Sequence, residues 1–326
     1  MGIAITRARN VEPTWTTAHI AHAALARGHS VRFIEPWDFE VDPIGRIVAR
    51  AHAFDTDQDG DIDPARLCRM LHAREARRRF VEVCRLDALL VRINPIDAAV
   101  LSFAMAAEEG GVVVLNAPKM VTWTSHKAWL ASLKGVPRPR TLVTRSRATI
   151  HAFAGELPGG AVVKPGRSSG GRGIAYVPKE RPAELDLALD HARGIGDGYL
   201  VVQEYLPEAE FGETRLVWLD GEILGSYVRQ RAPGEFRHNL KRGGVPEPHE
   251  PGPEDFRLIE ALNPHLRAAG VWFAGIDVIG GRVSEINTLN PGGLHLIQEF
   301  SGLDFSGPLV TALEARVQAG RKELSR

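Results

Sequence analysis

The sequence predicts an α/β fold in the N-terminal third of the chain and α+β structure in the remainder. A strand, helix, strand order at 3–34 favours a parallel sheet covered by helices. From residue 124 short strands and helices alternate, and from Tyr199 the strand signals become longer and mostly antiparallel. A chain of 326 residues with 44% hydrophobic content is long enough for two or three cores. We therefore expect three domains, at 1–117, 118–198 and 199–326.

Composition argues against several classes of function. Forty basic and forty acidic side chains cancel, so no overall field attracts nucleic acid or an anionic membrane. We interpret the basic run at 74–79 as the solvent face of a helix, and no stretch approaches the roughly 18 apolar residues of a membrane span. The two cysteines, Cys68 and Cys84, are expected as free thiols. These observations predict a cytoplasmic protein without nucleic-acid or membrane partners.

Hydrophobic runs and their stop signals define the N-terminal elements. Gly28 ends the first helix, Pro64 begins the second, and a turn at 116–118 marks the domain boundary. The expected strands lie at 3–5, 30–34, 88–92 and 112–115, and the expected helices at 16–27, 64–79 and 97–109.

The middle and C-terminal elements follow from the same signals. Thr124 or Ser125 is the expected cap of a helix that contains Lys127 and ends at Gly135. The other expected strands are 140–144, 161–164, 173–177, 200–205, 215–219 and 222–230, and the other expected helices are 148–153, 182–192 and 253–268.

A glycine-rich loop at 166–173 follows directly after Lys164, the last residue of an apolar strand. Its glycines leave backbone N–H groups free to approach phosphate oxygens, and Lys164 adds a compact positive charge. The loop alone is equally compatible with a flexible hairpin, because it lacks a Walker ending and precedes a strand. With 201–207 as a candidate adenine strand, the combination favours ATP binding.

An acidic hairpin at 275–287 is the second candidate site. Glu285 and Asn287 share one face of a strand. A two-residue loop would pair Asp277 with Ser284 and turn the carboxylates to opposite faces, whereas a three-residue loop would place Asp277 opposite Glu285. The second register gathers hard oxygen ligands for Mg²⁺. A solvated hairpin is the alternative, but alternation with apolar residues favours a metal site.

The acidic segment at 55–63 resembles the beginning of an EF-hand calcium loop. The position that requires a bidentate glutamate holds Arg66. We therefore interpret this segment as a solvated acidic loop, and weak cation binding there stays open.

From about Leu89 onward, the chain resembles the prokaryotic glutathione synthetases and, more broadly, the ATP-grasp carboxylate–amine ligases. The matching segments occur in order along the chain and are 116–118, 141–144, Lys164-Pro165 with its glycine loop, 203–207, 212–215, Arg237 with Asn239-Leu240 and Gly243-Gly244, 275–280 and 285–287. The resemblance implies an ATP-grasp fold. Residues 1–117 would form the preceding α/β domain, 118–198 the first lobe and 199–326 the second.

The resemblance also implies ATP and two Mg²⁺ ions as cofactors, with the glycine loop as a mobile lid. The nucleotide residues that it implies are Lys127, Lys164, Gly166, Ser168, Ser169, Gly170, Gly171, Gly173, Gln203, Glu204, Tyr205, Leu206, Glu213 and Arg215. It assigns Asp277, Glu285 and Asn287 to the metal, and Arg231, Arg237 and Asn239 to the acyl phosphate. From the residues alone, Lys127, Arg231 and Arg237 have plainer interpretations as surface charges, and Tyr205 as a core residue.

The activity that the resemblance implies is amide-bond formation between a small-molecule carboxylate and an amine through an acyl phosphate. Two segments depart from the family pattern. Residues 288–294 replace a Val-Thr-Ser-Pro-like stretch, and a paired-proline segment is shortened at 92–97. The substrate pair therefore stays open. The alternatives are an ATP-binding regulator resembling synapsin and a RimK-type ligase acting on a peptide or protein. Whether the chain forms a homo-oligomer is also open.

Overall fold

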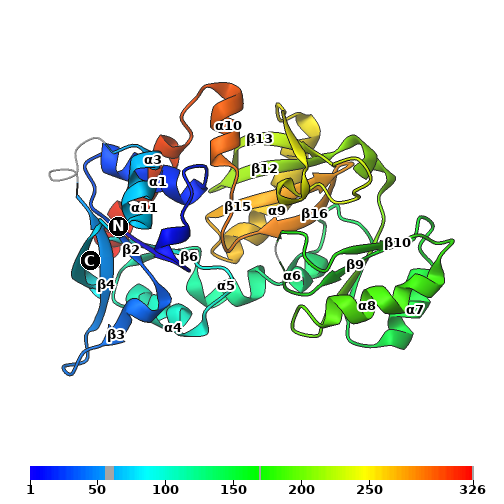
Figure 1. Cartoon of the computed structure of the whole chain (residues 1–326), viewed down its shortest axis with the longest axis horizontal. Helices are drawn as coiled ribbons and strands as arrows, with labels where there is room; N and C mark the ends of the chain where they lie inside the picture. Colours follow the sequence, from blue (N-terminus) through cyan, green and yellow to red (C-terminus); the bar gives the residue numbers. More distant parts are fainter. Residues whose placement is uncertain (56–61, 169, 325–326) are drawn as a thin grey trace. The chain divides into compact units, whose positions relative to one another are not determined.

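The computed structural model describes residues 1–55, 62–168 and 170–324 (Figure 1). The described residues divide into two compact units. Unit 1 comprises Met1–Thr122, Ala269–Ala274 and the residues from Thr288 on, and unit 2 comprises Trp123–Ala268 and Gly275–Asn287. The residues from Thr288 on were expected in the second lobe, but in the structure they group with unit 1. The predicted division near residue 198 stays a prediction.

A mixed sheet with strand order β3-β4-β2-β1-β6-β7 is the centre of unit 1, and β5 pairs with β4. The four strands β2, β1, β6 and β7 are parallel to one another. This confirms the predicted N-terminal parallel-sheet fold. The strands of this sheet are β1 (Gly2–Ile5), β2 (Val31–Ile34), β3 (Phe39–Val41), β4 (Ile47–Phe54), β5 (Arg77–Glu82), β6 (Ala88–Arg92) and β7 (Val113–Leu115).

Helices pack against both faces of this sheet because its strand residues alternate between two cores. Ile3 and Ile5 belong to one core, together with buried residues of α1 and α3 and Val310 of α11. Ala4 belongs to the other core, with buried residues of α4. The helices are α1 (Thr16–Ala26), α3 (Pro64–His72), α4 (Ala98–Glu109), α10 (Leu294–Ser301) and α11 (Ser306–Leu324). The packing of α11 on α1 explains why the C-terminal residues group with unit 1.

The predicted helix at 64–79 is wrong in its second half. The helix ends at His72, Arg74 adopts a positive φ of 58°, and 77–82 forms the edge strand β5, antiparallel to β4. The second half of the basic run, 77–79, is therefore strand, and Arg78 forms an ion pair with Asp38. Pairing with β4, which the sequence analysis did not predict, overrides the local helix signal.

The two cysteines are free, as predicted. Burial raises the pKa of the Cys68 thiol to about 11, so this thiol is protonated and unreactive near neutral pH. Cys84 lies in a short 3₁₀ turn (Val83–Arg85). Most of the acidic segment lies outside the described residues, but Asp63 accepts a hydrogen bond from the Arg66 backbone N–H at 2.6 Å and caps α3.

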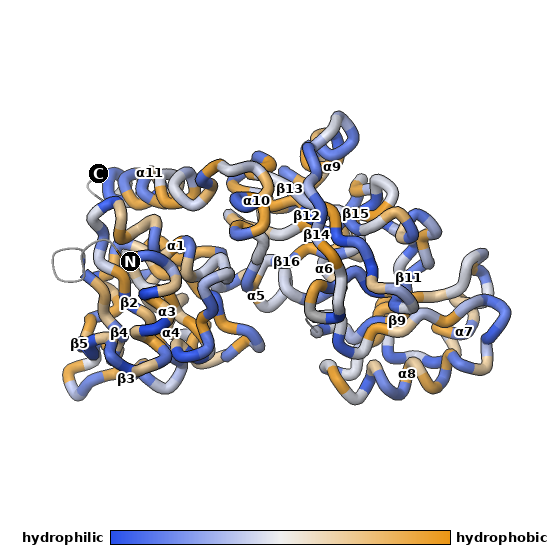
Figure 2. Tube along the Cα trace, turned by 45° about the horizontal axis from the view of Figure 1, so that its top comes forward, coloured by the Kyte–Doolittle hydropathy of each residue, from blue (hydrophilic) through white to orange (hydrophobic). Residues whose placement is uncertain are grey.

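Unit 2 contains two antiparallel sheets with the strand orders β10-β9-β11-β8 and β14-β13-β12-β15-β16. The first has strands β8 (Thr141–Thr144), β9 (Ala161–Pro165), β10 (Ala175–Val177) and β11 (Leu200–Glu204), with α7 (Arg147–Gly155) and α8 (Leu185–Arg193) packed in its core. The second has strands β12 (Glu213–Leu219), β13 (Glu222–Gln230), β14 (Val245–Pro248), β15 (Phe273–Ile279) and β16 (Arg282–Asn287), with α9 (Pro253–Ala268). Apolar and polar residues alternate along α8, as expected for a helix with one buried side (Figure 2).

Two short helices, α5 (Pro118–Thr124) and α6 (Lys127–Ser132), connect the N-terminal sheet to unit 2. The cap of α6 is His126, not Thr124 or Ser125, and the helix ends before the predicted Gly135. In the described ranges, no helix is both long and apolar enough to span a bilayer.

Buried Asn116 links three segments of unit 1. Its side-chain Nδ2 donates to the backbone oxygens of Phe273 at 2.8 Å and Thr288 at 2.6 Å. Its Oδ1 accepts from the backbone N–H groups of Trp272 at 2.7 Å and Phe273 at 3.0 Å. These backbone groups need a partner away from water, and one amide side chain supplies all of them.

We predict that Asn116→Ala destabilises the protein by about 2 to 4 kcal/mol, because several buried backbone groups lose their partner at once. Thermal and urea unfolding measure this loss. The exposed Asn10 provides the matched control, and Asn10→Ala should change stability by less than about 0.5 kcal/mol. Equal effects of the two substitutions would contradict the linking role of Asn116.

Candidate functional site

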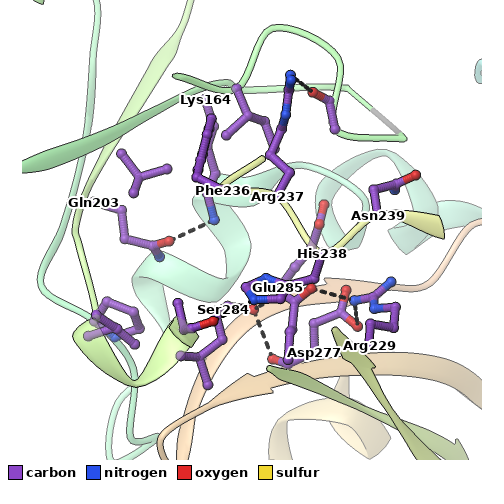
Figure 3. Close-up of a pocket in the computed structure, with 18 of the residues that line it drawn as sticks. Lys164, Gln203, Arg229, Phe236, Arg237, His238, Asn239, Asp277, Ser284 and Glu285 are labelled. Atoms are coloured by element: carbon purple, nitrogen blue, oxygen red, sulfur yellow. Dashed lines mark hydrogen bonds and ion pairs between the residues drawn. The ribbon is translucent and has the colours of Figure 1, made fainter. Parts of the chain in front are cut away.

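A pocket in unit 2 gathers side chains from both of its sheets and from α6 (Figure 3). It is lined by most of the residues that the sequence analysis selected: Lys127, Lys164, Ser168, Gly170, Gly171, Gln203, Glu204, Tyr205, Leu206, Glu213, Arg215, Arg237, Asn239, Asp277, Glu285 and Asn287. Of the other selected residues, Gly166, Gly173 and Arg231 are not among its lining residues, and Ser169 lies outside the described residues. The glycine-rich strand end and the acidic hairpin therefore meet at one cavity.

The acidic hairpin reaches its register by a route that the sequence analysis did not consider. Ile279 pairs with Arg282, so the loop has only two residues. A β-bulge between Asp277 and Val278 then shifts the pairing, and Asp277 lies opposite Glu285. The expectation that a two-residue loop turns the carboxylates to opposite faces is therefore wrong, because the bulge inserts Ser284 as an extra residue.

Two arginines hold the buried carboxylate of Asp277. Arg215 donates from Nε to Oδ1 at 2.5 Å and from its terminal nitrogen to Oδ2 at 2.9 Å, and Arg229 lies 2.6 Å from Oδ1. Burial alone would raise the pKa of Asp277, but the two guanidinium groups outweigh it and lower the pKa to about 2. Asp277 is thus ionised near neutral pH although it is only 2% exposed.

Glu213 extends this charge network across the sheet. It accepts from Arg229 at 2.7 Å through Oε2 and from the Ser284 hydroxyl at 2.8 Å through Oε1. Arg229 and Ser284 line the pocket, yet the sequence analysis did not select either one. Glu213 and Arg229 are cross-strand partners. Their pairing differs by one residue from the register that the β12–β13 turn alone predicts, because a bulge lies between Val217 and Trp218.

The two lysines of the pocket have different partners. Lys164 donates to the neutral side-chain oxygen of Gln203 at 2.7 Å. Lys127 lies 2.9 Å from Glu285 Oε1 and donates to the backbone oxygen of Ser168 at 3.2 Å. Burial lowers the pKa of Lys164, and neighbouring Lys127 lowers it further, while acidic neighbours including Glu285 oppose the shift. Both lysines lie near the same acid, Glu285. Two positive charges beside one negative charge leave an excess of positive charge, which favours an anionic ligand.

Glu285 is ionised in the same field. Burial raises its pKa, but the positive charges of Lys127 and Lys164 prevail and lower it overall. Its side chain is 27% exposed, so part of the carboxylate faces the pocket. Asn287 donates to Asp277 Oδ2 at 3.2 Å, and Glu285 lies opposite Asp277 in the strand pairing.

The donor set of the hairpin fits Mg²⁺. Among the residues that the structure describes, no cluster of three or more His, Cys, Asp or Glu side chains is arranged for a metal ion. The predicted set has two ionised carboxylates and one amide oxygen, which are hard oxygen donors and too few to complete an all-protein shell. Mg²⁺ keeps water and phosphate ligands beside one or two carboxylates, so this composition matches a metal that arrives with a nucleotide.

Aromatic and apolar residues also line the pocket. Tyr205 stacks on Tyr176 with ring centroids 4.3 Å apart, and the Glu204 carboxylate accepts from the Arg140 backbone N–H at 3.2 Å. The apolar lining consists of Pro139, Val162, Ile174, Leu206 and Ile279. Tyr205 therefore packs on another ring and also borders the cavity.

The arginines predicted near the acyl phosphate differ in position. Arg237 lines the pocket, where Glu235 accepts from it at 2.8 and 2.6 Å and the backbone oxygen of Gly171 accepts at 3.3 Å. Arg231 instead lies 3.5 Å from Glu210, outside the lining. Phe236 and His238 also border the pocket, although the sequence analysis did not select them. Arg237 thus connects the 235–239 loop to the glycine loop.

Unit 2 has two sheets around a pocket, and this pocket contains two lysines and a buried acidic hairpin. A mixed-sheet domain comes before it in the chain. This combination defines an ATP-grasp ligase. Residues 5–122 match the N-terminal domain of prokaryotic glutathione synthetase, and residues 127–302 match its ATP-grasp domain. The chain belongs to the prokaryotic glutathione synthetase family, as predicted from the sequence. It is accordingly an ATP-dependent, glutathione synthetase-like ligase, and ATP-grasp enzymes use ATP and magnesium.

Individual relatives agree with this assignment. The glutathione synthetase of Salmonella typhimurium is 33% identical over 246 residues, which cover 73% of this chain and 76% of that protein. The enzyme of Vibrio parahaemolyticus is 29% identical over 304 residues, 90% of this chain and 91% of that one. The crystal structure of a D-cycloserine synthetase aligns with a TM-score of 0.67 and 17% identity, covering 97% of this chain and 99% of that one. The D-alanine–D-alanine ligase of Coxiella burnetii aligns at 0.62 and 13%, covering 100% and 97%. The two solved structures share the fold.

We predict that Asp277→Asn lowers stability at pH 7 by about 3 to 5 kcal/mol, because two buried guanidinium groups lose their shared carboxylate. The lowered pKa fixes the pH dependence, since this stabilisation is complete above the ordinary Asp pKa of about 4 and is lost as the pH falls toward 2. Thermal unfolding of both proteins across this range should show the difference shrinking in acid. Asp220→Asn in the exposed β12–β13 turn is the control, and a D277N variant as stable as wild type would contradict the network.

Proposed function

We propose that this chain joins a carboxylate to an amine in the unit 2 pocket, by transferring the terminal phosphoryl group of ATP to the carboxylate. One observation carries the proposal: Lys127 and Lys164 line the same cavity as the ionised Asp277 and Glu285. The lysines match phosphate oxygens, and the carboxylates match the magnesium that accompanies them. The cavity thus has complementary charges for both parts of Mg-ATP.

For the nucleotide, we propose that Lys127, Lys164 and the described residues of the glycine loop contact the phosphates. The aromatic and apolar side chains of the pocket then receive adenine, with Gln203, Glu204, Tyr205 and Leu206 around the base. Glu213 and Arg215 would contact ribose or phosphate. The composition of the lining supports the proposal, because the pocket combines charged side chains, which suit phosphate, with aromatic and apolar side chains, which suit a base.

For the metal, we propose two Mg²⁺ ions with Asp277, Glu285 and Asn287 as the protein ligands. When bound, magnesium neutralises the negative charge of the phosphates and polarises them. Both carboxylates are ionised before the metal binds, because the two arginines lower the pKa of Asp277 and Lys127 lowers the pKa of Glu285. Lys127 is within reach of both a carboxylate and the glycine loop, which suits a residue that neutralises transferred charge.

Ligation needs an activated carboxylate because a free carboxylate is a poor electrophile whose oxygen is a poor leaving group. Transfer of the terminal phosphoryl group of ATP to the carboxylate gives ADP and an acyl phosphate. Attack by the amine on the carbonyl carbon then forms the amide and expels phosphate, and the amine loses a proton. We assign Arg237 and Asn239 to the acyl phosphate, since both line the pocket and Arg237 contacts the glycine loop. The proposal does not extend to Arg231, which lies outside the lining.

The relatives named glutathione synthetase make γ-glutamylcysteine and glycine the first substrate pair to test. Both are small molecules, and we place the reaction in the cytoplasm, where free thiols such as those of Cys68 and Cys84 stay reduced. The altered segments at 92–97 and 288–294 are where we expect a different donor or amine to be selected. The proposal for this chain is therefore the carboxylate–amine class, with glutathione as its simplest product.

We predict that Lys164→Ala and Glu285→Ala each reduce acceptor-dependent ADP release by at least about 100-fold, because each removes charge stabilisation at the transferred group. A coupled assay for ADP measures the loss. Lys134, an exposed lysine of the same unit, is the matched control, and Lys134→Ala should retain full activity. Full activity in both pocket variants would exclude this site.

We further predict that ADP release by the wild-type protein requires both a carboxylate and an amine. Pairs of small-molecule carboxylates and amines should be screened for ADP, starting with γ-glutamylcysteine and glycine, and the products identified by mass. The expected product mass equals the sum of the two substrates minus water. ATP binding without turnover on any pair would argue against a ligase and for a regulatory nucleotide site.

A further inference from the structure

His126 lies between the helix that carries Lys127 and the beginning of the glycine loop. Its Nδ1 accepts a hydrogen bond from the Ala128 backbone N–H at 3.0 Å, and its Nε2 lies 3.0 Å from Asp197 Oδ2. Because Nδ1 accepts from a backbone donor, it carries no proton, and the hydrogen of the neutral ring is assigned to Nε2, which donates to Asp197. Both ring nitrogens are therefore used, and the side chain is only 10% exposed.

The same ring packs against the residue that begins the glycine loop. A Cβ added to Gly166 would lie 2.7 Å from His126 Nε2, so only a glycine fits beside the ring. The backbone N–H of Lys127 donates to the Gly166 oxygen at 3.1 Å, and the Gly166 N–H donates to the Tyr199 oxygen at 2.9 Å. His126, the backbone of Lys127 and Gly166 thus form one hydrogen-bonded and packed group.

Lys127 is positioned from both ends. Its backbone is fixed by the His126 cap and by Gly166, and its Nζ reaches Ser168 and Glu285 in the pocket. A histidine cap differs from the usual Ser, Thr, Asp or Asn cap, because protonation of the imidazole abolishes its acceptor. A proton on Nδ1 would also place a positive charge beside the positive end of a helix.

We propose that neutral His126 is a positioning residue for phosphate binding: it holds Lys127 and Gly166 together, and protonation of its ring releases both. This inference rests on the proposed function, in which Lys127 contacts the nucleotide phosphates. It makes the affinity for Mg-ATP depend on the protonation of a side chain that does not itself line the pocket.

The surroundings keep the ring neutral near pH 7. Burial is the largest cause and lowers the pKa of His126, and the positive charges of Arg167 and Lys127 lower it further. Asp197 opposes this shift by its charge and its hydrogen bond. The Tyr199 ring contacts His126 edge-on, with centroids 6.1 Å apart. Since the pKa lies below the ordinary value of about 6.5, positioning is complete above that pH and is lost as the pH falls through the lowered pKa.

We predict distinct pH dependences for two substitutions of His126. Asn keeps a cap acceptor that does not titrate, so His126→Asn should bind Mg-ATP within about threefold of wild type at pH 7.5 and lose less affinity than wild type toward pH 5.5. Ala has no acceptor, so His126→Ala should bind about fivefold or more weakly throughout, in line with a cap contribution of about 1 kcal/mol. Isothermal calorimetry with Mg-ATP between pH 5.5 and 8 measures both.

The control is His191→Asn, which alters an exposed histidine on α8 and should reproduce the wild-type pH profile. Thermal unfolding without nucleotide shows whether each variant is folded, and His126→Asn decides the outcome if the alanine variant is not. If wild type binds no Mg-ATP, the proposed function fails. If wild type binds it and His126→Asn loses affinity in acid as steeply as wild type, the positioning role of His126 is refuted and the proposed function stands.

Discussion

The ionised carboxylate of Asp277 is the constraint on which the candidate site depends. It is buried within a sheet and forms ion pairs with two arginines, Arg215 and Arg229. Glu213 supplies the second negative charge, so Arg215 and Arg229 are balanced within the protein. Lys164 is not balanced in the same way, because its hydrogen-bond partner Gln203 is neutral. The positive charges of the two arginines are therefore balanced within the protein, whereas the charge of Lys164 attracts an anion.

Much of the fold follows from local sequence signals, and the rest depends on long-range pairing. The strand at 88–92 and the helix at 253–268 have the predicted bounds, because apolar runs and breaker residues mark them directly. The strand pair β4 and β5 was missed, since the basic residues of β5 carry no strand periodicity that is visible without its partner. The grouping of α11 with unit 1 was missed for the same reason, because it depends on contacts across almost the whole chain.

The candidate site was predictable in composition but not in detail. Spacing and resemblance selected Lys164, Asp277 and Glu285, which do line one pocket. Two bulges decide which side chains share a face, and neither leaves a clear mark in the sequence, so Arg229 and Ser284 were not selected. The His126 cap was missed because histidine is an uncommon cap, and Thr124 and Ser125 stand close before it. The roles of these residues in catalysis stay proposals.

The chain enters unit 1 three times, at its beginning, at 269–274 and from Thr288 on. During synthesis, the N-terminal sheet leaves the ribosome long before α11, which covers α1 in the finished protein. Nascent unit 1 therefore exposes apolar surface of its first helix while the two segments of unit 2, Trp123–Ala268 and Gly275–Asn287, are still being translated. Completion of the N-terminal core must wait for the last helix, which makes this protein dependent on protection of that surface until its final segment emerges.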